Sequence, residues 1–287
     1  TAAKPIRITE DGSLCRIIEA VFVCGPSAIV RQYVFDKRHG ELVIRDRILY
    51  NHKDHMLKLD IPLGFAPKES VSDAVYSAVT RTPTRDYEEQ PNQRWVAVRG
   101  TGGGCIAVAN SGSFAHNLTR KSLCINVMRS PAYTSFGLAP DDPWTDKRFA
   151  PRHDQGEHQV QYRVMFSKRF DERKVSDAAA ALNTPPIFQV FYPSGGYARS
   201  SWLRRTSPPI EVGPDNVRIT AVKKAEKGEA LIVRVLELAG RASTFELRVA
   251  GRGVIRLEIG AYALKTVRIS RKGDRNWWRE VSLVEGL

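Results

Sequence analysis

The sequence predicts an all-β protein built from two antiparallel β-sandwich units. Apolar and polar residues alternate with a period of two along several stretches, such as 160–166 (VQYRVMF), which is typical of strands with one buried face. Clusters of turn-forming residues, such as Gly25-Pro26 and Lys227-Gly228, separate these stretches. At roughly 150 residues per domain, the length of 287 residues indicates about two domains.

In the first part of the chain, we expect strands at about 95–99, 105–110, 122–129 and 158–167. Gly100–Gly104 lies between the first two and superficially resembles a phosphate-binding loop. Such a loop must open a helix, whose free N–H groups hold the anion. An apolar strand pattern follows here instead, so the glycines predict a tight hairpin turn.

One stretch, Lys174–Leu182, has its apolar residues on one helical face. It ends at Asn183-Thr184-Pro185-Pro186, a helix stop signal that predicts a domain boundary. We therefore expect one domain over 1–184 and a second over 185–287. In the second, alternation predicts strands over 245–249 and 255–259.

Two long connections are expected in the first domain, Lys68–Gln93 and Ser130–Gln155. Connections longer than about 15 residues are usually functional or lie against another domain.

The net charge is +13, from 44 basic and 31 acidic residues. The basic residues are dispersed among acidic ones, so no dedicated basic arm is indicated and we expect no nucleic-acid partner. No apolar run approaches 18 residues, so no membrane-spanning helix is expected. Thr1–Arg7 lacks the apolar stretch of a signal peptide, which favours a cytoplasmic location.

The four cysteines, Cys15, Cys24, Cys105 and Cys124, form no C-x-x-C pair. They lie among apolar, strand-like residues. This setting predicts buried free thiols rather than disulfides.

Several polar clusters contain residue types that occur in metal-binding or ligand-binding sites. His153–His158 contains metal-ligating residue types but reads as a turn, and 51–55 reads as a solvated connection, so we expect no metal site. Solvated loop charges are the default for Asp86, Glu88 and Glu89. A further segment interleaves aromatic and cationic residues, and both a sugar- or base-stacking platform and an interdomain linker stay open for it: Tyr192, Tyr197, Arg199, Trp202, Arg204 and Arg205.

Several motifs occur in an order that resembles one known family. In the first domain they are RTPT at 81–84, EEQPNQRWVAV at 88–98, GCIAVANSGSFAH at 104–116, LCINVMRSP at 123–131 and DQGEHQVQY at 154–162. Further matches follow at 216–226, 228–240 and 259–269. Together they resemble the C-terminal β region of glycoside hydrolase family 38, the α-mannosidases. The segment 278–285 departs from the family order, because it follows the closing strand instead of preceding it, and its pairing stays open.

The resemblance implies a large antiparallel supersandwich of the galactose-mutarotase type, followed by a smaller C-terminal β-sandwich. It implies that the family's aspartate nucleophile, and zinc or another divalent metal, belong to a catalytic barrel upstream of these residues. We therefore expect no catalytic residue, metal ligand or cofactor in this chain, which alone should be inactive. The expected partners are the protein's own N-terminal barrel and a mannose-containing glycan, with a homo-oligomer left open.

One substrate-binding residue is implied by the resemblance. In related enzymes an arginine of the β domain reaches towards the sugar, and Arg81, just before the Pro83 turn, is the candidate. A guanidinium donates several hydrogen bonds in fixed directions, which suits sugar hydroxyls. A surface arginine is the open alternative. At the level of the whole chain, the alternative function is a stand-alone carbohydrate-binding β-sandwich module.

Overall fold

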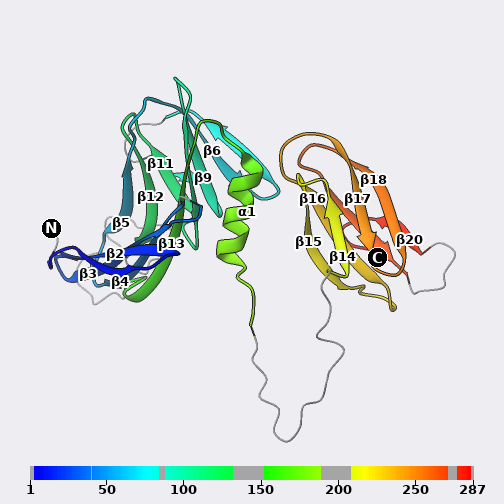
Figure 1. Cartoon of the computed structure of the whole chain (residues 1–287), viewed down its shortest axis with the longest axis horizontal. Helices are drawn as coiled ribbons and strands as arrows, with labels where there is room; N and C mark the ends of the chain where they lie inside the picture. The colour runs from blue at the N-terminus through cyan, green and yellow to red at the C-terminus, as the bar shows by residue number, and fades with distance from the viewer. Residues whose placement is uncertain are drawn as a thin grey trace, which may run out of the picture. The chain divides into compact units, whose positions relative to one another are not determined.

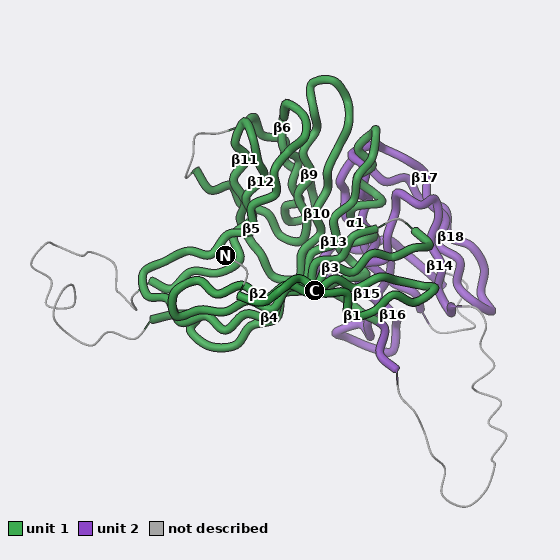
Figure 2. The backbone as a smooth tube through the Cα atoms, turned by 60° about the vertical axis from the view of Figure 1, so that its left-hand side comes forward, with its two compact units in different colours: residues 1–185 green, residues 186–287 purple. Residues whose placement is uncertain are grey.

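The computed structural model describes residues 3–39, 41–83, 88–131, 152–188, 208–270 and 277–285. Within these ranges the chain forms strands β1 to β20 and one helix, α1 (Figure 1). The chain divides into two compact units, unit 1 (1–185) and unit 2 (186–287) (Figure 2). No described helix combines the length and the apolar character that crossing a membrane requires.

Unit 1 contains a large antiparallel sheet with the strand order β1-β2-β3-β4-β13-β10-β9-β6-β7. Sequence neighbours pair as hairpins, whereas β13 inserts between β4 and β10. The bounds are β1 Arg7–Asp11, β2 Cys15–Cys24, β3 Ser27–Asp36, β4 Glu41–Tyr50, β6 Pro67–Ala74, β7 Ser77–Arg81, β9 Trp95–Gly100, β10 Cys105–Asn110 and β13 Gly156–Ser167.

A second antiparallel sheet faces the large one, with the order β5-β12-β11-β8. Its strands are β5 (Met56–Pro62), β8 (Gln90–Pro91), β11 (Ala115–Leu118) and β12 (Ser122–Arg129). Inward side chains of both sheets form one buried core, which includes Ile44, Val108 and Tyr162 from the large sheet with Leu123 and Ile125 from the small one. Unit 1 is therefore an antiparallel β-sandwich, as the alternation predicts.

Helix α1 (Glu172–Asn183) covers the other face of the large sheet, against β9, β10 and β13 (Figure 1). The Asp171 carboxylate caps its first turn by accepting from the N–H of Lys174. Val175, Ala178 and Ala179 pack on the outward side chains of β9 and β10. Because these two strands are buried on both faces, their sequences read as continuous apolar runs rather than alternating ones.

Unit 2 consists of two smaller antiparallel sheets, in the orders β14-β17-β18 and β15-β16-β19-β20. Their shared hydrophobic core includes Phe245, Leu247 and Ile255, packed among Val233 and Val267. The last strand, β20, pairs antiparallel with β19. The sequence alone did not indicate the partner of this segment. The bounds are β14 Ile210–Gly213, β15 Val217–Lys224, β16 Leu231–Glu237, β17 Ser243–Val249, β18 Gly253–Ile259, β19 Leu264–Ile269 and β20 Trp278–Val281.

The expectation of a long loop over Lys68–Gln93 is wrong. This segment contains most of β6 and all of β7, which form one edge of the large sheet. The sequence of β6, PKESVSDA, carries no apolar alternation, because three of its four buried positions are polar and only Val71 is apolar. Ser70, Ser72 and Asp73 are all at most 4% exposed and have hydrogen-bond partners: His116 on β11, Arg81 on β7, and the backbone N–H of Arg94, respectively.

Two shorter connections lie where the sequence predicts them. Residues 101–103 form the turn between β9 and β10, and 51–55 connect β4 to β5. All four cysteines are free, but only Cys105 is buried, and Cys24 is exposed at the end of β2. The prediction of buried thiols is thus wrong for the other three. Asp86 and the interleaved aromatic and cationic residues from Tyr192 to Arg205 lie outside the described residues, as does most of Ser130–Gln155.

Candidate functional site

Arg81 is the last residue of β7, at the edge of the large sheet. Its Nη1 donates to Ser72 Oγ at 2.8 Å, on the neighbouring strand β6, and lies 3.5 Å from the carbonyl oxygen of Pro91. The side chain is partly buried. One nitrogen of the guanidinium is therefore fixed by the sheet, while Nε and Nη2 donate to no described residue.

A buried polar cluster lies beside Arg81. Asn92 donates from Nδ2 to the Ser113 carbonyl oxygen at 2.9 Å, so its Oδ1 faces the ring of His116 at 3.2 Å. Since Oδ1 can only accept, His116 donates from Nδ1 and accepts from Ser70 Oγ at Nε2, 3.3 Å away. Burial, and to a lesser extent the charge of Arg81, lower the pKa of His116 to about 4. The imidazole is accordingly neutral near pH 7.

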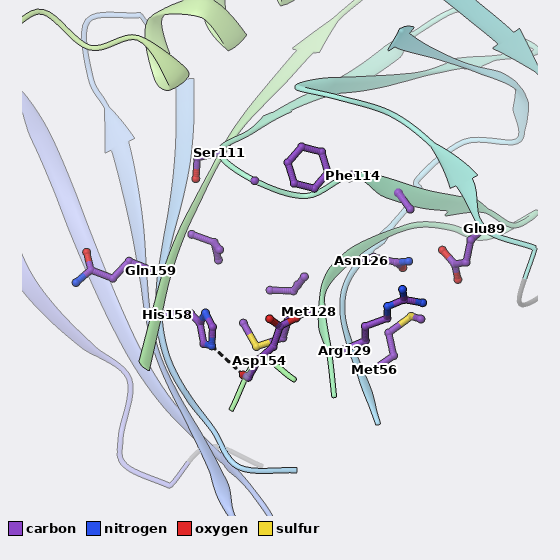
Figure 3. A pocket seen from close by; sticks show the side chains of 14 residues that line it. Met56, Glu89, Ser111, Phe114, Asn126, Met128, Arg129, Asp154, His158 and Gln159 are labelled. Carbon is purple, nitrogen blue, oxygen red and sulfur yellow. Dashed lines mark hydrogen bonds between the residues drawn. The ribbon is translucent and has the colours of Figure 1, made fainter. Parts of the chain in front are cut away.

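A separate pocket opens in unit 1 between β12 of the small sheet and β13 of the large sheet, with a volume of about 670 Å³ (Figure 3). It is assembled from the start of β5, the residue before β8, the loop from β10 to β11, the end of β12 and the turn into β13. Arg81 does not line it. Four of the motifs that carry the family resemblance each contribute side chains to this one pocket.

A backbone irregularity explains why four consecutive residues of β12, 126–129, line the pocket. Its pairing with β5 contains an irregularity between Asn126 and Met128, where Val127 is the extra residue. A bulge of this kind re-aims the following side chains. On the other wall, Asp154 and Gly156 adopt positive φ angles of 55° and 127°, which turn the chain sharply into β13.

The apolar part of the pocket comes from Met56, Phe114, Val127, Met128 and Val160. Phe114 and Met56 are 68% and 42% exposed, so both side chains are open to a ligand. An exposed aromatic ring at a pocket rim is a ready contact surface for a ligand.

The polar part combines hydrogen-bond donors and acceptors. Figure 3 shows Glu89, Asn126 and Arg129 together on one side, with His158 across from them. Glu89 Oε1 accepts from Lys58, whereas Glu89 Oε2 and Asn126 Oδ1 are buried and accept from none of the described residues. The Arg129 guanidinium makes no hydrogen bond or ion pair with another described residue.

A backbone carbonyl in the turn before β13 determines which ring nitrogen of His158 carries the proton. Its Nε2 lies 2.8 Å from the backbone carbonyl oxygen of Asp154, the dashed line in Figure 3. A carbonyl only accepts, so Nε2 carries the proton and Nδ1 of the neutral ring is an acceptor. The pocket thus offers one cationic donor and several acceptors around an apolar surface, which is the composition of a binding site.

The sequence alone did not single out this pocket. Arg129 and His158 lie in quoted motifs, at 123–131 and 154–162, which was the available signal. Of the residues in the predicted turn His153–His158, only Asp154 and His158 line the pocket. Across the described residues, no three His, Cys, Asp or Glu side chains are placed to hold a metal ion.

The fold is similar to that of solved proteins. The fold matches a solved α-mannosidase from Enterococcus faecalis with a TM-score of 0.69 and 16% identity, over 92% of this chain and 35% of that one. A solved protein of glycosyl hydrolase family 38, also from Enterococcus faecalis, matches with a TM-score of 0.71 and 16% identity, over 92% of this chain and 36% of that one. The chain therefore spans about a third of the length of these structures. No curated protein matches the sequence.

A family model agrees with the fold. Residues 216–270, in unit 2, match the glycosyl hydrolases family 38 C-terminal beta sandwich domain. This confirms the resemblance to family 38 that the sequence motifs indicate. It also fits the all-β architecture of both units, since the matched domain is itself a β-sandwich.

Proposed function

We propose that this chain is the non-catalytic β region of an α-mannosidase, an enzyme that removes terminal α-D-mannose residues. The carrying observation is that one fold, shared with a solved α-mannosidase, extends over 92% of the chain. The family match at 216–270 supports the same assignment independently of that fold comparison. In this role the chain supports a catalytic barrel and contributes to substrate binding.

The division of labour follows from the chemistry. Glycoside hydrolysis requires an acid and a nucleophile or base on either side of the scissile bond. The resemblance assigns the nucleophile and a divalent metal to the barrel. The described residues contain no group of three His, Cys, Asp or Glu side chains placed to hold a metal ion.

Arg81 is our proposed substrate contact from this region. Its bond to Ser72 restrains the side chain, and its Nε and Nη2 retain donor capacity for sugar hydroxyls. A restrained guanidinium loses less conformational freedom when it binds, so the contact is favourable for substrate positioning.

The test is the kinetics of Arg81 variants in the full-length enzyme, with an aryl α-mannoside as substrate. Loss of a charge-assisted contact should lower kcat/KM by roughly 10- to 150-fold in Arg81→Ala. Arg81→Lys should recover little, because an ammonium cannot reproduce the planar fork. Wild-type kinetics for Arg81→Ala, in enzyme shown to be folded, would make Arg81 an ordinary surface residue.

A further inference from the structure

The pocket between β12 and β13 has features that the proposed supporting role does not require. It combines an exposed aromatic ring, an imidazole acceptor and an arginine that pairs with no described residue, all within one compact unit. We propose that this pocket is a sugar-binding site of the chain itself, which takes one neutral hexose ring of a mannose-containing glycan. The choice of glycan rests on the proposed function, whereas the site rests on the pocket alone.

The polar side chains argue for a ligand that forms hydrogen bonds. His158 Nδ1 is an acceptor in the neutral ring, because Nε2 already donates to the Asp154 carbonyl oxygen. Arg129, which is exposed and lines the same pocket, supplies donors. A ligand that both donates and accepts hydrogen bonds therefore suits the pocket.

The charges around the pocket are balanced. Glu89 is paired with Lys58, and the lining holds one further cationic side chain, Arg129, and one further acidic side chain, Asp154. Neither an anion nor a cation is favoured by such a lining. A hydroxyl both donates and accepts, so a polyhydroxylated neutral molecule satisfies both kinds of group at once.

The apolar side of the pocket completes the match to a sugar. A hexose ring has one face rich in C–H groups, and such a face packs on an aromatic ring. Phe114 offers its ring at the rim, and Met56 and Val160 extend the apolar surface inside. The volume of about 670 Å³ falls within the range of small-ligand pockets and exceeds what one hexose needs, so the rest of a glycan has room to leave.

The experiment is an amide NMR titration of the isolated chain with methyl α-D-mannopyranoside. We expect saturable shifts at the amides of Phe114, Ala115, Met128 and His158, with a Kd on the order of 1 mM for a single ring. Phe114→Ala and Arg129→Ala should each weaken binding at least ten-fold. Both side chains are exposed, so the dispersion of the spectrum should be unchanged.

Phe166→Ala is the matched control, since Phe166 is 69% exposed, against 68% for Phe114, and does not line this pocket. It should bind the mannoside like wild type. Absence of saturable shifts up to 50-fold above the expected Kd (roughly 50 mM) would overturn the proposal. So would equal binding by Phe114→Ala and Phe166→Ala, or equal shifts with glycerol. Because the titration needs no barrel, its failure leaves the α-mannosidase assignment standing, and an inactive full-length enzyme leaves a positive titration standing.

Discussion

The buried His116 makes the stability of unit 1 depend on pH in a defined window. In the folded state its pKa is lowered from 6.5 to about 4. As the pH falls below 6.5, His116 becomes protonated in the unfolded chain, whereas in the folded chain it stays neutral until the pH approaches 4. Stability from this group is therefore fully present above pH 6.5 and is lost as the pH falls towards 4. At 1.36 kcal/mol per pKa unit, the loss amounts to about 3 kcal/mol.

The assay is urea unfolding between pH 4.5 and 7, followed by tryptophan fluorescence. In a background that carries Trp144→Phe and Trp202→Phe, Trp95, which is 1% exposed, reports the unfolding of unit 1, and Trp277 and Trp278 report that of unit 2. His116→Gln should be less stable at pH 7 but should lose most of the pH dependence of unit 1. His158→Gln, which removes a partly exposed histidine from the same unit, should keep it. Parallel pH profiles for wild type and His116→Gln would refute the reasoning.

Three further outcomes are expected. Glu237→Gln should destabilise unit 2 by about 3 kcal/mol in urea unfolding, because Glu237 Oε2 accepts from the backbone N–H groups of Arg241 and Tyr262, and an amide nitrogen cannot. Burial alone would raise the pKa of Glu237, but these bonds and that from Asn216 outweigh it and hold the pKa below its usual value. Acid should therefore weaken wild-type unit 2 as Glu237 protonates, and a Glu237→Gln variant with the same acid response would contradict this. Incubation with EDTA should leave the Tm of the chain unchanged, whereas a drop of several degrees that zinc reverses would reveal a structural metal. Leu123→Ala should cost about 2–5 kcal/mol in unit 1, because Leu123 is fully buried between the two sheets; a loss under 1 kcal/mol would show that the core relaxes around it.

Much of the fold could be predicted from local pattern. The strands β9, β10, β12 and β13 begin and end within two residues of their predicted bounds, and α1 extends the predicted helix by two residues at one end and one at the other. In β12 and β13, alternation with one buried face is a strong signal. In β9 and β10, burial on both faces gives short apolar runs, which predict buried strands equally well.

The failures have physical causes. β6 escaped detection because Ser70, Ser72 and Asp73 occupy buried positions that alternation assigns to apolar residues. They are tolerated there because each finds a partner: Asp73 accepts from the backbone N–H groups of Gln93, Arg94 and Trp95. Those partners lie twenty or more residues away, so no local window contains the information.

The pocket could not be predicted for the same reason. Met56, Glu89, Phe114, Arg129 and His158 are spread over a hundred residues. The pairings of β5 with β12 and of β4 with β13 bring them to one end of the sandwich. Four of these residues, Glu89, Phe114, Arg129 and His158, lie in motifs of the family resemblance. These residues come together because of the order of strands in the two sheets, and that order is seen only in the structure.

The central claim, that this chain is the β region of an α-mannosidase, is tested most directly by one comparison. The rate of hydrolysis of 4-nitrophenyl α-D-mannopyranoside is measured for the full-length gene product and for residues 1–287 alone, each with and without added Zn²⁺. The account predicts turnover by the full-length protein and none above background by the isolated chain. Turnover by the isolated chain that a point mutation within it abolishes, or a folded, metal-loaded full-length protein inactive on the α-mannoside, would contradict it.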